Sequence, residues 1–136
     1  MRVRHVHDGD TVFLQADRSG PVVASTAQVK VRLIGVDTPE VSPPAECYGR
    51  QAAEQVRGLL PVGSPVWVSA DAGPRDRHGR RLLYVWTSAG RFVNYEIVRE
   101  GWGEAIRVEP NVAYWPLLRD AGADAQRAGR GLWGSC

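Results

Sequence analysis

Cysteine is scarce in this sequence and long apolar runs are missing, and both absences exclude whole classes of protein. The only cysteines are Cys47 and Cys136, which are too few for a disulfide-rich scaffold and form no close pair that would indicate zinc. No stretch approaches the ~18 consecutive apolar residues of a membrane span, so we expect no membrane partner. Residues 1–4 also lack the apolar core of a secretion signal, so we expect either a protein that stays inside the cell or a chain without its leader.

Lysine is almost absent, since Lys30 is the only one among 17 basic residues. With 15 acidic residues the net charge is +2, and the pI is near 8.8. This balance is only mildly basic and does not by itself indicate a nucleic-acid partner. Arginine binds phosphate and carboxylate groups through paired hydrogen bonds, but a compositional bias of the source genome explains most of these arginines equally well. Only arginines at particular positions can therefore indicate function.

The length and composition are those of one globular domain. A chain of 136 residues suits a single domain, which we expect to span 1–136 and to be a monomer. Hydrophobic residues make up 43% and charged residues 24%, which excludes a largely disordered chain. There is no internal repeat, low-complexity tract or block of like charge.

Hydrophobic periodicity divides the chain into strands first and helices later. Alternation is clearest over 28–34, where the apolar row alternates with Arg32 on the other face. Residues 15–26 are typical of the far end of a hairpin, with a turn at Ser19-Gly20-Pro21. The predicted strands are 3–7, 11–16, 28–34, 65–70 and 81–87, and the predicted helices are 48–60, 93–100 and 115–128. This α+β pattern, mainly β, fits a closed five-stranded OB-fold barrel that carries three α-helices.

Three polar clusters lie near the ends of predicted strands. Asp10 follows an Asp-Gly pair, which by itself is typical of a hairpin turn. Asp37 ends the strand that contains Arg32, and Glu40 lies in the proline-rich loop beyond it, although a capped turn would explain both acids. Arg80 belongs to a third, arginine-rich cluster that a solvated turn explains equally well.

Together the three clusters supply the groups that phosphodiester hydrolysis requires. A hard divalent cation needs several oxygen ligands, which Asp10 and Asp37 can provide. An attacking water needs a base, and Glu40 can serve as one. Charge that accumulates on the phosphoryl oxygens needs fixed positive donors, which Arg32 and Arg80 can supply. No serine–histidine pair or cysteine nucleophile lies in a comparable context, and the two histidines of the first strand lack a third ligand for zinc.

The order and spacing of these motifs resemble the staphylococcal nuclease (thermonuclease) family along almost the whole chain. The segments that carry the resemblance are Asp8-Gly9-Asp10-Thr11-Val12, residues 32–40, Cys47-Tyr48-Gly49, Asp76-Arg77-His78-Gly79-Arg80, Val93-Asn94, Pro110-Asn111 and Gly131-Leu132-Trp133. The resemblance implies an OB-fold barrel with three helices. It also implies calcium-dependent hydrolysis of DNA and RNA with low sequence specificity, leaving 3′-phosphate ends.

The resemblance also assigns roles to individual residues. The implied roles are Ca²⁺ ligands for Asp10, Asp37 and the Thr38 carbonyl, general base for Glu40, and phosphate-binding donors for Arg32 and Arg80. Every one of these positions holds the expected residue, which argues against the alternative of a non-catalytic OB-fold module that binds nucleic acid. A calcium-binding structural domain without hydrolysis is a third interpretation.

The sequence departs from the family's type enzyme near the expected nucleotide. Ile106 and Val108 are aliphatic where the type enzyme has tyrosines flanking the nucleotide, and His78 replaces a usual tyrosine. We expect Arg77 and His78 to contact nucleic acid, with a solvated turn as the alternative. These replacements put base stacking at the type enzyme's positions in question.

The cysteine pair is absent from the type enzyme but resembles a pattern in other bacterial members. The alternatives are a Cys47–Cys136 bridge and two free thiols. The resemblance supports the bridge, and a disulfide favours an extracellular or cell-envelope location, with any signal peptide absent from this chain.

Overall fold

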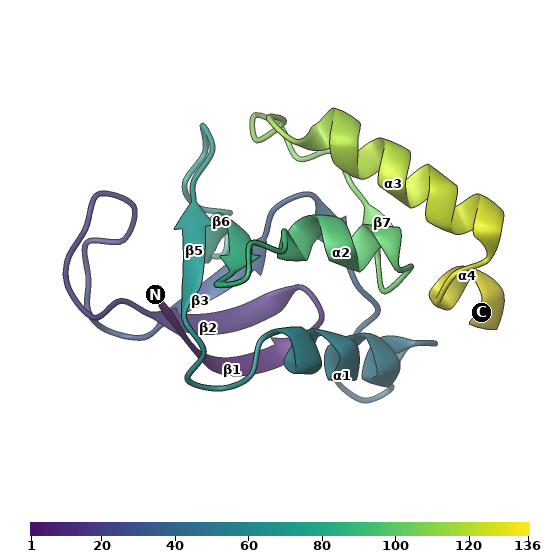
Figure 1. Ribbon diagram of the computed structural model, residues 1–136, viewed down its shortest axis with the longest axis horizontal. Helices are drawn as coiled ribbons and strands as arrows, with labels where there is room; N and C mark the ends of the chain where they lie inside the picture. The colour runs from purple at the N-terminus through teal and green to yellow at the C-terminus, as the bar shows by residue number, and fades with distance from the viewer.

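A five-stranded sheet forms the body of the computed structural model, which describes all residues 1–136 (Figure 1). β1 (Arg2–Asp8), β2 (Thr11–Gln15) and β3 (Val29–Leu33) are antiparallel neighbours. β3 pairs in parallel with β6 (Arg81–Thr87), which pairs antiparallel with β5 (Val66–Ser69). The strand order is therefore β1-β2-β3-β6-β5.

The two edge strands of this sheet approach each other. The backbone N–H of Val66 donates to Met1 O at 2.8 Å, and the N–H of Val3 donates to Ser64 O at 3.0 Å. A mixed α+β fold with this strand order and these edge contacts is consistent with the predicted OB fold.

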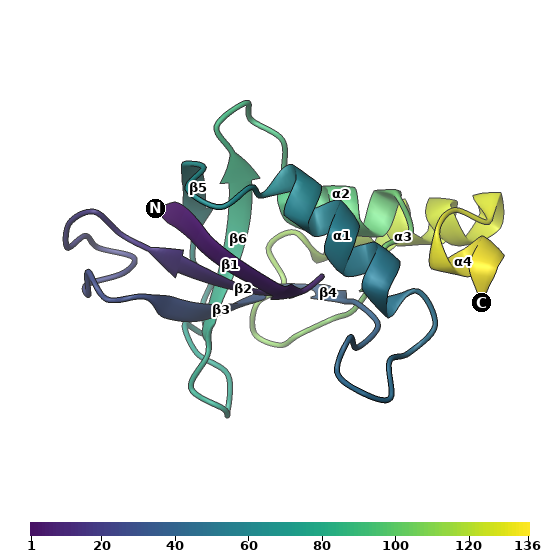
Figure 2. The ribbon, with the colours of Figure 1, turned by 90° about the horizontal axis from the view of Figure 1, so that it is seen from below.

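Two helices pack on the sheet, and a third helix and one short helical segment lie beyond them. α1 (Gly49–Leu59) packs on β1, α2 (Val93–Arg99) on β6, and α3 (Trp115–Ala128) on α2. α4 (Leu132–Ser135) follows near the C-terminus, and Figure 2 shows it with α3 at the opposite end of the molecule from the β2–β3 loop. The three predicted helices are confirmed, each to within one residue at either end. None of the helices is both long and apolar enough to cross a membrane.

The core lies between the inner face of the sheet and the helices. Val3, Leu14 and Val31 point inward from β1, β2 and β3, and Val56 and Ile97 meet them from α1 and α2, all with 0% exposure. Removing these apolar side chains from water is the main favourable contribution to folding. The alternation that buries them directs the intervening polar residues of the same strands outward.

Some short elements were not predicted. β4 (Val36–Asp37) and β7 (Glu104–Ala105) form a separate antiparallel pair, and two-residue strands are too short to show alternation. The segment 15–26 is the far end of the β2–β3 hairpin, as predicted, but β2 ends at Gln15 and β3 begins at Val29. Residues 16–28 are therefore a loop, because they contain no alternating apolar row, although Val23 is buried in the core.

Candidate active site

The turn between β1 and β2 positions Asp10, which is only 3% exposed. Its Oδ2 accepts a hydrogen bond from the backbone N–H of Thr38 at 2.8 Å. Its Oδ1 accepts one from the Thr11 hydroxyl at 3.0 Å. The Asp10 carboxylate therefore joins the β1–β2 turn to the segment that follows β4.

Arg32 contacts both of the predicted metal carboxylates. Its Nη1 donates to the carbonyl oxygens of Leu33 at 3.0 Å and Val36 at 2.6 Å, which fixes the orientation of the planar guanidinium group. Its Nη2 lies 3.4 Å from Asp10 Oδ2 and 3.5 Å from Asp37 Oδ1. Asp10 precedes β2 and Asp37 follows β3 in the sequence, yet both meet at a single nitrogen atom.

The carboxylates of this cluster are close enough to change one another's pKa. Burial and then the charge of Asp10 raise the pKa of Asp37, and Arg32 only partly opposes them. Burial, together with a hydrogen bond to Asp10 and its charge, raises the pKa of Asp8 to about 7. The charge of Glu40 adds to both increases. A nearby cation would favour the ionised carboxylates and oppose these shifts.

Glu40 lies in the loop over residues 38–48 and is hydrogen-bonded across it to Glu46. The backbone N–H of Glu40 donates to Glu46 Oε1 at 2.8 Å, and the N–H of Glu46 donates to Glu40 O at 3.0 Å. α1 begins at Gly49, directly against this loop. A Cβ at Gly49 would overlap the Glu40 carbonyl oxygen, so this close contact requires glycine. The exposed Glu40 side chain is therefore held on a short loop beside the carboxylate cluster.

Asp76 holds Arg80 through both of its carboxylate oxygens. Arg80 Nε donates to Asp76 Oδ2 at 2.7 Å, and the backbone N–H of Arg80 donates to Oδ1 at 2.9 Å. The N–H of His78 also donates to Oδ1, at 2.9 Å. Burial raises the pKa of Asp76, but these hydrogen bonds outweigh it and hold the pKa below its ordinary value. Asp76 is therefore a charged acceptor that orients the Arg80 side chain.

Strand pairing brings the start of β6, which follows Arg80 directly, alongside Arg32. Leu82 pairs with Arg32 across β3 and β6, and Arg80 precedes Leu82 by two residues in the turn before β6. The side chain of Arg80 contacts Asp76, and no hydrogen bond or ion pair joins it to Arg32 or to the carboxylate cluster. Arg77 and His78 are exposed in the turn before Arg80. No hydrogen bond or ion pair connects their side chains to the carboxylate cluster, so their predicted contact with nucleic acid stays a prediction.

A disulfide joins Cys47 to Cys136 across 89 residues of sequence. It ties the C-terminal end of the chain, just after α4, to the end of the loop that carries Glu40. A cavity of about 220 Å³ adjoins this disulfide, and its lining includes Asp37, Thr38 and both cysteines. The bridge therefore lies at the border of the candidate site.

The donor atoms of the site fit a hard cation, although no three His, Cys, Asp or Glu side chains are grouped so that they alone could hold a metal. The expected set needs only two carboxylates, because the Thr38 carbonyl would supply a third oxygen. Thr38 itself is 3% exposed, and its hydroxyl oxygen is buried without a hydrogen-bond partner. An all-oxygen set of this kind suits Ca²⁺ better than it suits zinc or copper.

Three residues of the site were missed by sequence reasoning. Asp8 was read as a turn residue, yet it follows Val6 by two positions, and alternation from Val6 would have placed it on the buried side of β1. Asp76 precedes Arg80 by four residues, a spacing at which an acidic side chain can accept hydrogen bonds from the amides of a turn. This spacing could have indicated its contact with Arg80. Glu46 had no signal, because its contact with Glu40 depends on the path of an irregular loop.

Comparisons with known proteins agree with the motif resemblance. A family model described as "Staphylococcal nuclease homologue" matches residues 30–135. The chain is 35% identical over 134 residues to a thermonuclease of Staphylococcus intermedius, covering 96% of this chain and 74% of that protein. It is 33% identical over 135 residues to a thermonuclease of Staphylococcus hyicus, covering 97% and 74%. Endonuclease YhcR of Bacillus subtilis is 29% identical over 141 residues, which span 96% of this chain but 11% of that protein.

Proposed function

Because the chain belongs to the staphylococcal nuclease family, we propose that it hydrolyses phosphodiester bonds of DNA and RNA with low sequence specificity. The observation that carries the proposal is the contact of both Asp10 and Asp37 with one guanidinium nitrogen of Arg32. Carboxylates suited to a cation and an arginine suited to a phosphate thus meet at one point of the sheet.

Asp10, Asp37 and the backbone carbonyl of Thr38 are the groups that we assign to Ca²⁺. The family resemblance and the all-oxygen donor set support calcium. When bound, the ion neutralises and orients a substrate phosphate. Asp10 stays in place through its hydrogen bond from Thr38, so the acid and the carbonyl of the next segment are held as one unit.

Glu40 is the base that we assign to the attacking water. It accepts a proton from the water, whose oxygen forms a new bond to phosphorus while the bond from phosphorus to the 5′-oxygen breaks. The departing 5′-oxygen takes a proton from solvent, which leaves a 5′-hydroxyl and a 3′-phosphate. Arg32 and Arg80 hold the phosphoryl oxygens where negative charge is greatest. Losing one such fixed donor typically costs about 2.7–4 kcal/mol, or roughly 10²–10³ in rate.

The closed barrel and an oxidising location are further parts of the proposal. The hydrogen bonds between Met1 and Val66 and between Val3 and Ser64 support closure. The Cys47–Cys136 disulfide supports an extracellular or cell-envelope location, because reducing compartments keep most thiols free.

Digestion assays test the proposed function. Plasmid DNA and RNA are incubated with the protein in Ca²⁺, in Mg²⁺ and with chelator, and end-labelling identifies the product termini. We expect cleavage in Ca²⁺ with 3′-phosphate ends, no cleavage with chelator, and a large loss of rate in Glu40→Gln. Nucleic acid that is bound but stays intact after long incubation would instead favour the non-catalytic module. Calcium-dependent thermal stabilisation without cleavage or binding would favour the structural calcium domain.

A further inference from the structure

The outer face of β1, β2 and β3 carries aromatic and basic side chains that the catalytic roles leave unused. Phe13 of β2 is half-buried and pairs with the exposed Lys30 of β3. His5 of β1 pairs with Phe13 from the other side, and both His5 and His7 are exposed. These four residues are called the β1–β3 strip below.

The side chains of the strip contact one another. Lys30 Nζ lies 5.9 Å from the centroid of the Phe13 ring. The His5 ring centroid lies 5.9 Å from that of Phe13 and 6.4 Å from that of His7. One cation and three rings therefore form a continuous surface, with Phe13 at its centre.

The strip is continuous with the candidate active site. Thr11 pairs with Arg32 just as Phe13 pairs with Lys30, two residues along the same two strands. Two residues correspond to about 6.6 Å along a strand, and side chains two apart share a face. The Thr11 hydroxyl donates to Asp10, which belongs to the site assigned to the scissile phosphate. The strip therefore begins two residues along β2 from that site.

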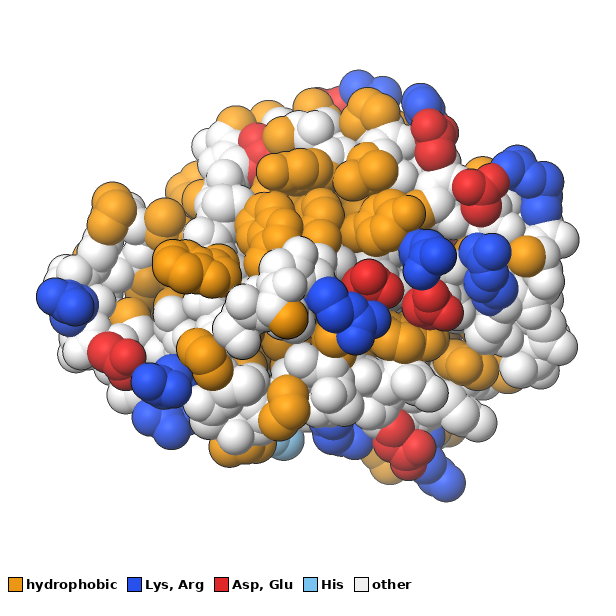
Figure 3. Space-filling model, in the orientation of Figure 1, with side chains coloured by type: hydrophobic (Ala, Val, Ile, Leu, Met, Phe, Trp, Pro, Cys, Tyr) orange, Lys and Arg blue, Asp and Glu red, His pale blue; other side chains and the backbone are white.

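The exposed charged side chains of β1, β2 and β3 themselves are basic, although Arg2 of β1 pairs with Asp17 of the β2–β3 loop. The only carboxylate within β1, β2 and β3 is Asp8, which is 3% exposed and points away from solvent. The helical side of the molecule differs, because acidic and basic side chains are interspersed there (Figure 3). Some of its arginines are paired with adjacent acids, as Arg119 is with Asp120 and Arg127 with Asp124. A polyanion therefore meets less opposing charge on the β1–β3 face.

We propose that the β1–β3 strip binds the single-stranded part of a nucleic-acid substrate next to the scissile phosphate. Phe13 and the two histidines provide stacking surfaces for bases, and Lys30 provides a charge for the adjoining backbone phosphate. Proteins that bind single strands without sequence preference combine a basic track with aromatic stacking in this way. The bases of a duplex are paired inside and cannot stack on such a surface. The inference rests on the proposed function for the position of the nucleic-acid strand relative to the scissile phosphate. Binding itself can be measured without cleavage.

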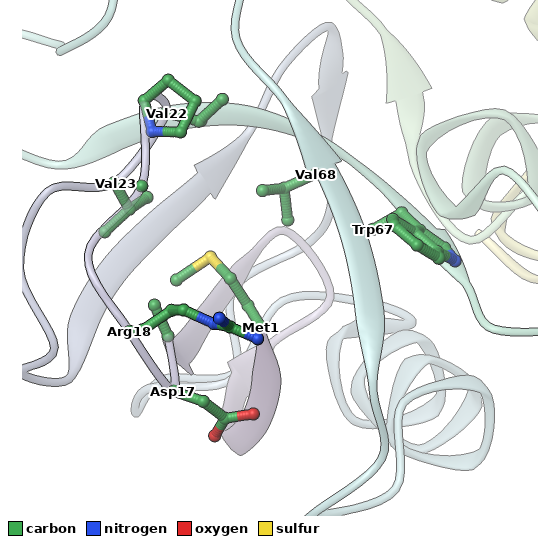
Figure 4. A pocket seen from close by; sticks show the side chains of 10 residues that line it. Met1, Asp17, Arg18, Val22, Val23, Trp67 and Val68 are labelled. Carbon is green, nitrogen blue, oxygen red and sulfur yellow. The ribbon is translucent and has the colours of Figure 1, made fainter.

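Another exposed aromatic residue supplies a matched control. Trp67 is 71% exposed on β5, at the edge of the sheet opposite β1 in strand order. Figure 4 shows Trp67 at the border of the cavity that Met1, Val23 and Val68 also line. It lies outside the strip, so its removal should not change binding of a strand that follows β2 and β3. Arg119 on α3 is the corresponding control for Lys30.

Binding of fluorescently labelled oligothymidylate in the presence of chelator tests the strip. We expect Phe13→Leu to weaken binding by about 5- to 150-fold, the range found for removal of one stacking ring, and Phe13→Trp to retain it. Lys30→Gln should reduce the slope of log affinity against log salt by about 0.7, the value for one single-strand phosphate contact. Trp67→Leu and Arg119→Gln should leave both quantities unchanged. Thermal unfolding monitored by circular dichroism verifies that each variant is folded.

Three results separate this inference from the proposed function. Wild-type binding by folded Phe13→Leu and Lys30→Gln overturns the strip, whether or not the protein cleaves nucleic acid. An equal loss of duplex binding in these variants overturns the preference for single strands. If the wild-type protein cleaves nothing yet the strip variants bind weakly, the proposed function fails and the strip stands. Where cleavage occurs, the ratio of kcat/KM for long over dinucleotide substrates should fall in both variants.

Discussion

Asp76→Asn is the substitution that most directly tests how Arg80 is held. The carboxylate accepts hydrogen bonds from Arg80 Nε at 2.7 Å and from the Arg80 backbone N–H at 2.9 Å. Asparagine keeps the shape but removes the charge, and its amide group presents one acceptor oxygen where the carboxylate has two. The backbone contact can therefore survive while the contact to Nε is lost.

The size of the effect follows from the kind of bond that is removed. A hydrogen bond to a charged group contributes about 1.5–3 kcal/mol, more than a neutral one. If that energy keeps Arg80 aimed at the phosphoryl oxygens, its loss lowers kcat by about 10- to 100-fold, at ~1.4 kcal/mol per tenfold. KM should change little, because Arg80 is assigned to the charge that develops during the reaction.

A double-mutant cycle separates orientation of Arg80 from a general effect on the fold. Steady-state digestion of a defined oligonucleotide gives kcat and KM for Asp76→Asn, Arg80→Ala and the double variant. Because Asp76 is assigned to act only through Arg80, the double variant should be no slower than Arg80→Ala. Additive losses, or an Asp76→Asn enzyme with wild-type kcat, would refute the assignment of Asp76 as the residue that positions Arg80.

Three further predictions follow from single contacts. Cys47→Ser should lower the free energy of unfolding by about 4 kcal/mol in the chain-entropy model for so long a loop, and reductant should destabilise the wild type but not the variant in thermal melts. Asp71 accepts hydrogen bonds from a tyrosine hydroxyl and two backbone amides, which outweigh its burial and hold its pKa below the ordinary 3.8. The stability that these bonds contribute is present above that pH and is lost as the pH falls through the lowered pKa. Melting temperature should therefore fall less steeply below pH ~4 in Asp71→Asn, and parallel curves would contradict this. Gly49→Ala should reduce nuclease activity because its Cβ would displace the carbonyl group of Glu40, whereas Gly58→Ala, where a Cβ meets no atom within 4 Å, should retain it.

The elements that could be predicted are those in which apolar residues recur at a regular spacing along the chain. The helix over Gly49–Leu59 was evident because its apolar positions recur at helical spacing, and the strand over Val29–Leu33 because they alternate. The pair Val36–Asp37 and Glu104–Ala105 was not evident, since each is two residues long and its partner is distant in the sequence. Such pairing is decided by the packing of the surrounding elements rather than by local pattern.

The candidate site was predictable in its composition and less so in its contacts. Motif spacing identified Asp10, Asp37 and Arg32, which lie together in the structure. It did not reveal that Asp8 is buried beside Asp10, because an Asp-Gly pair is so common in exposed turns. Sequence patterns identify residue types at spacings, whereas the burial that shifts the pKa of Asp8 depends on long-range packing.

The register of β3 determines the core, the candidate site and the proposed strip at once. Val31 and Leu33 are buried at 0% and 1% exposure, so the intervening Arg32 and the preceding Lys30 must point outward. A slip of one residue would expose the buried side chains, at about 1.5–3 kcal/mol for each, and would turn both cations into the core. Hydrophobic burial therefore fixes the direction of Arg32 independently of its contact with Asp10. For this reason, substitutions that weaken β3 pairing should impair the placement of Arg32 and the binding of single strands together.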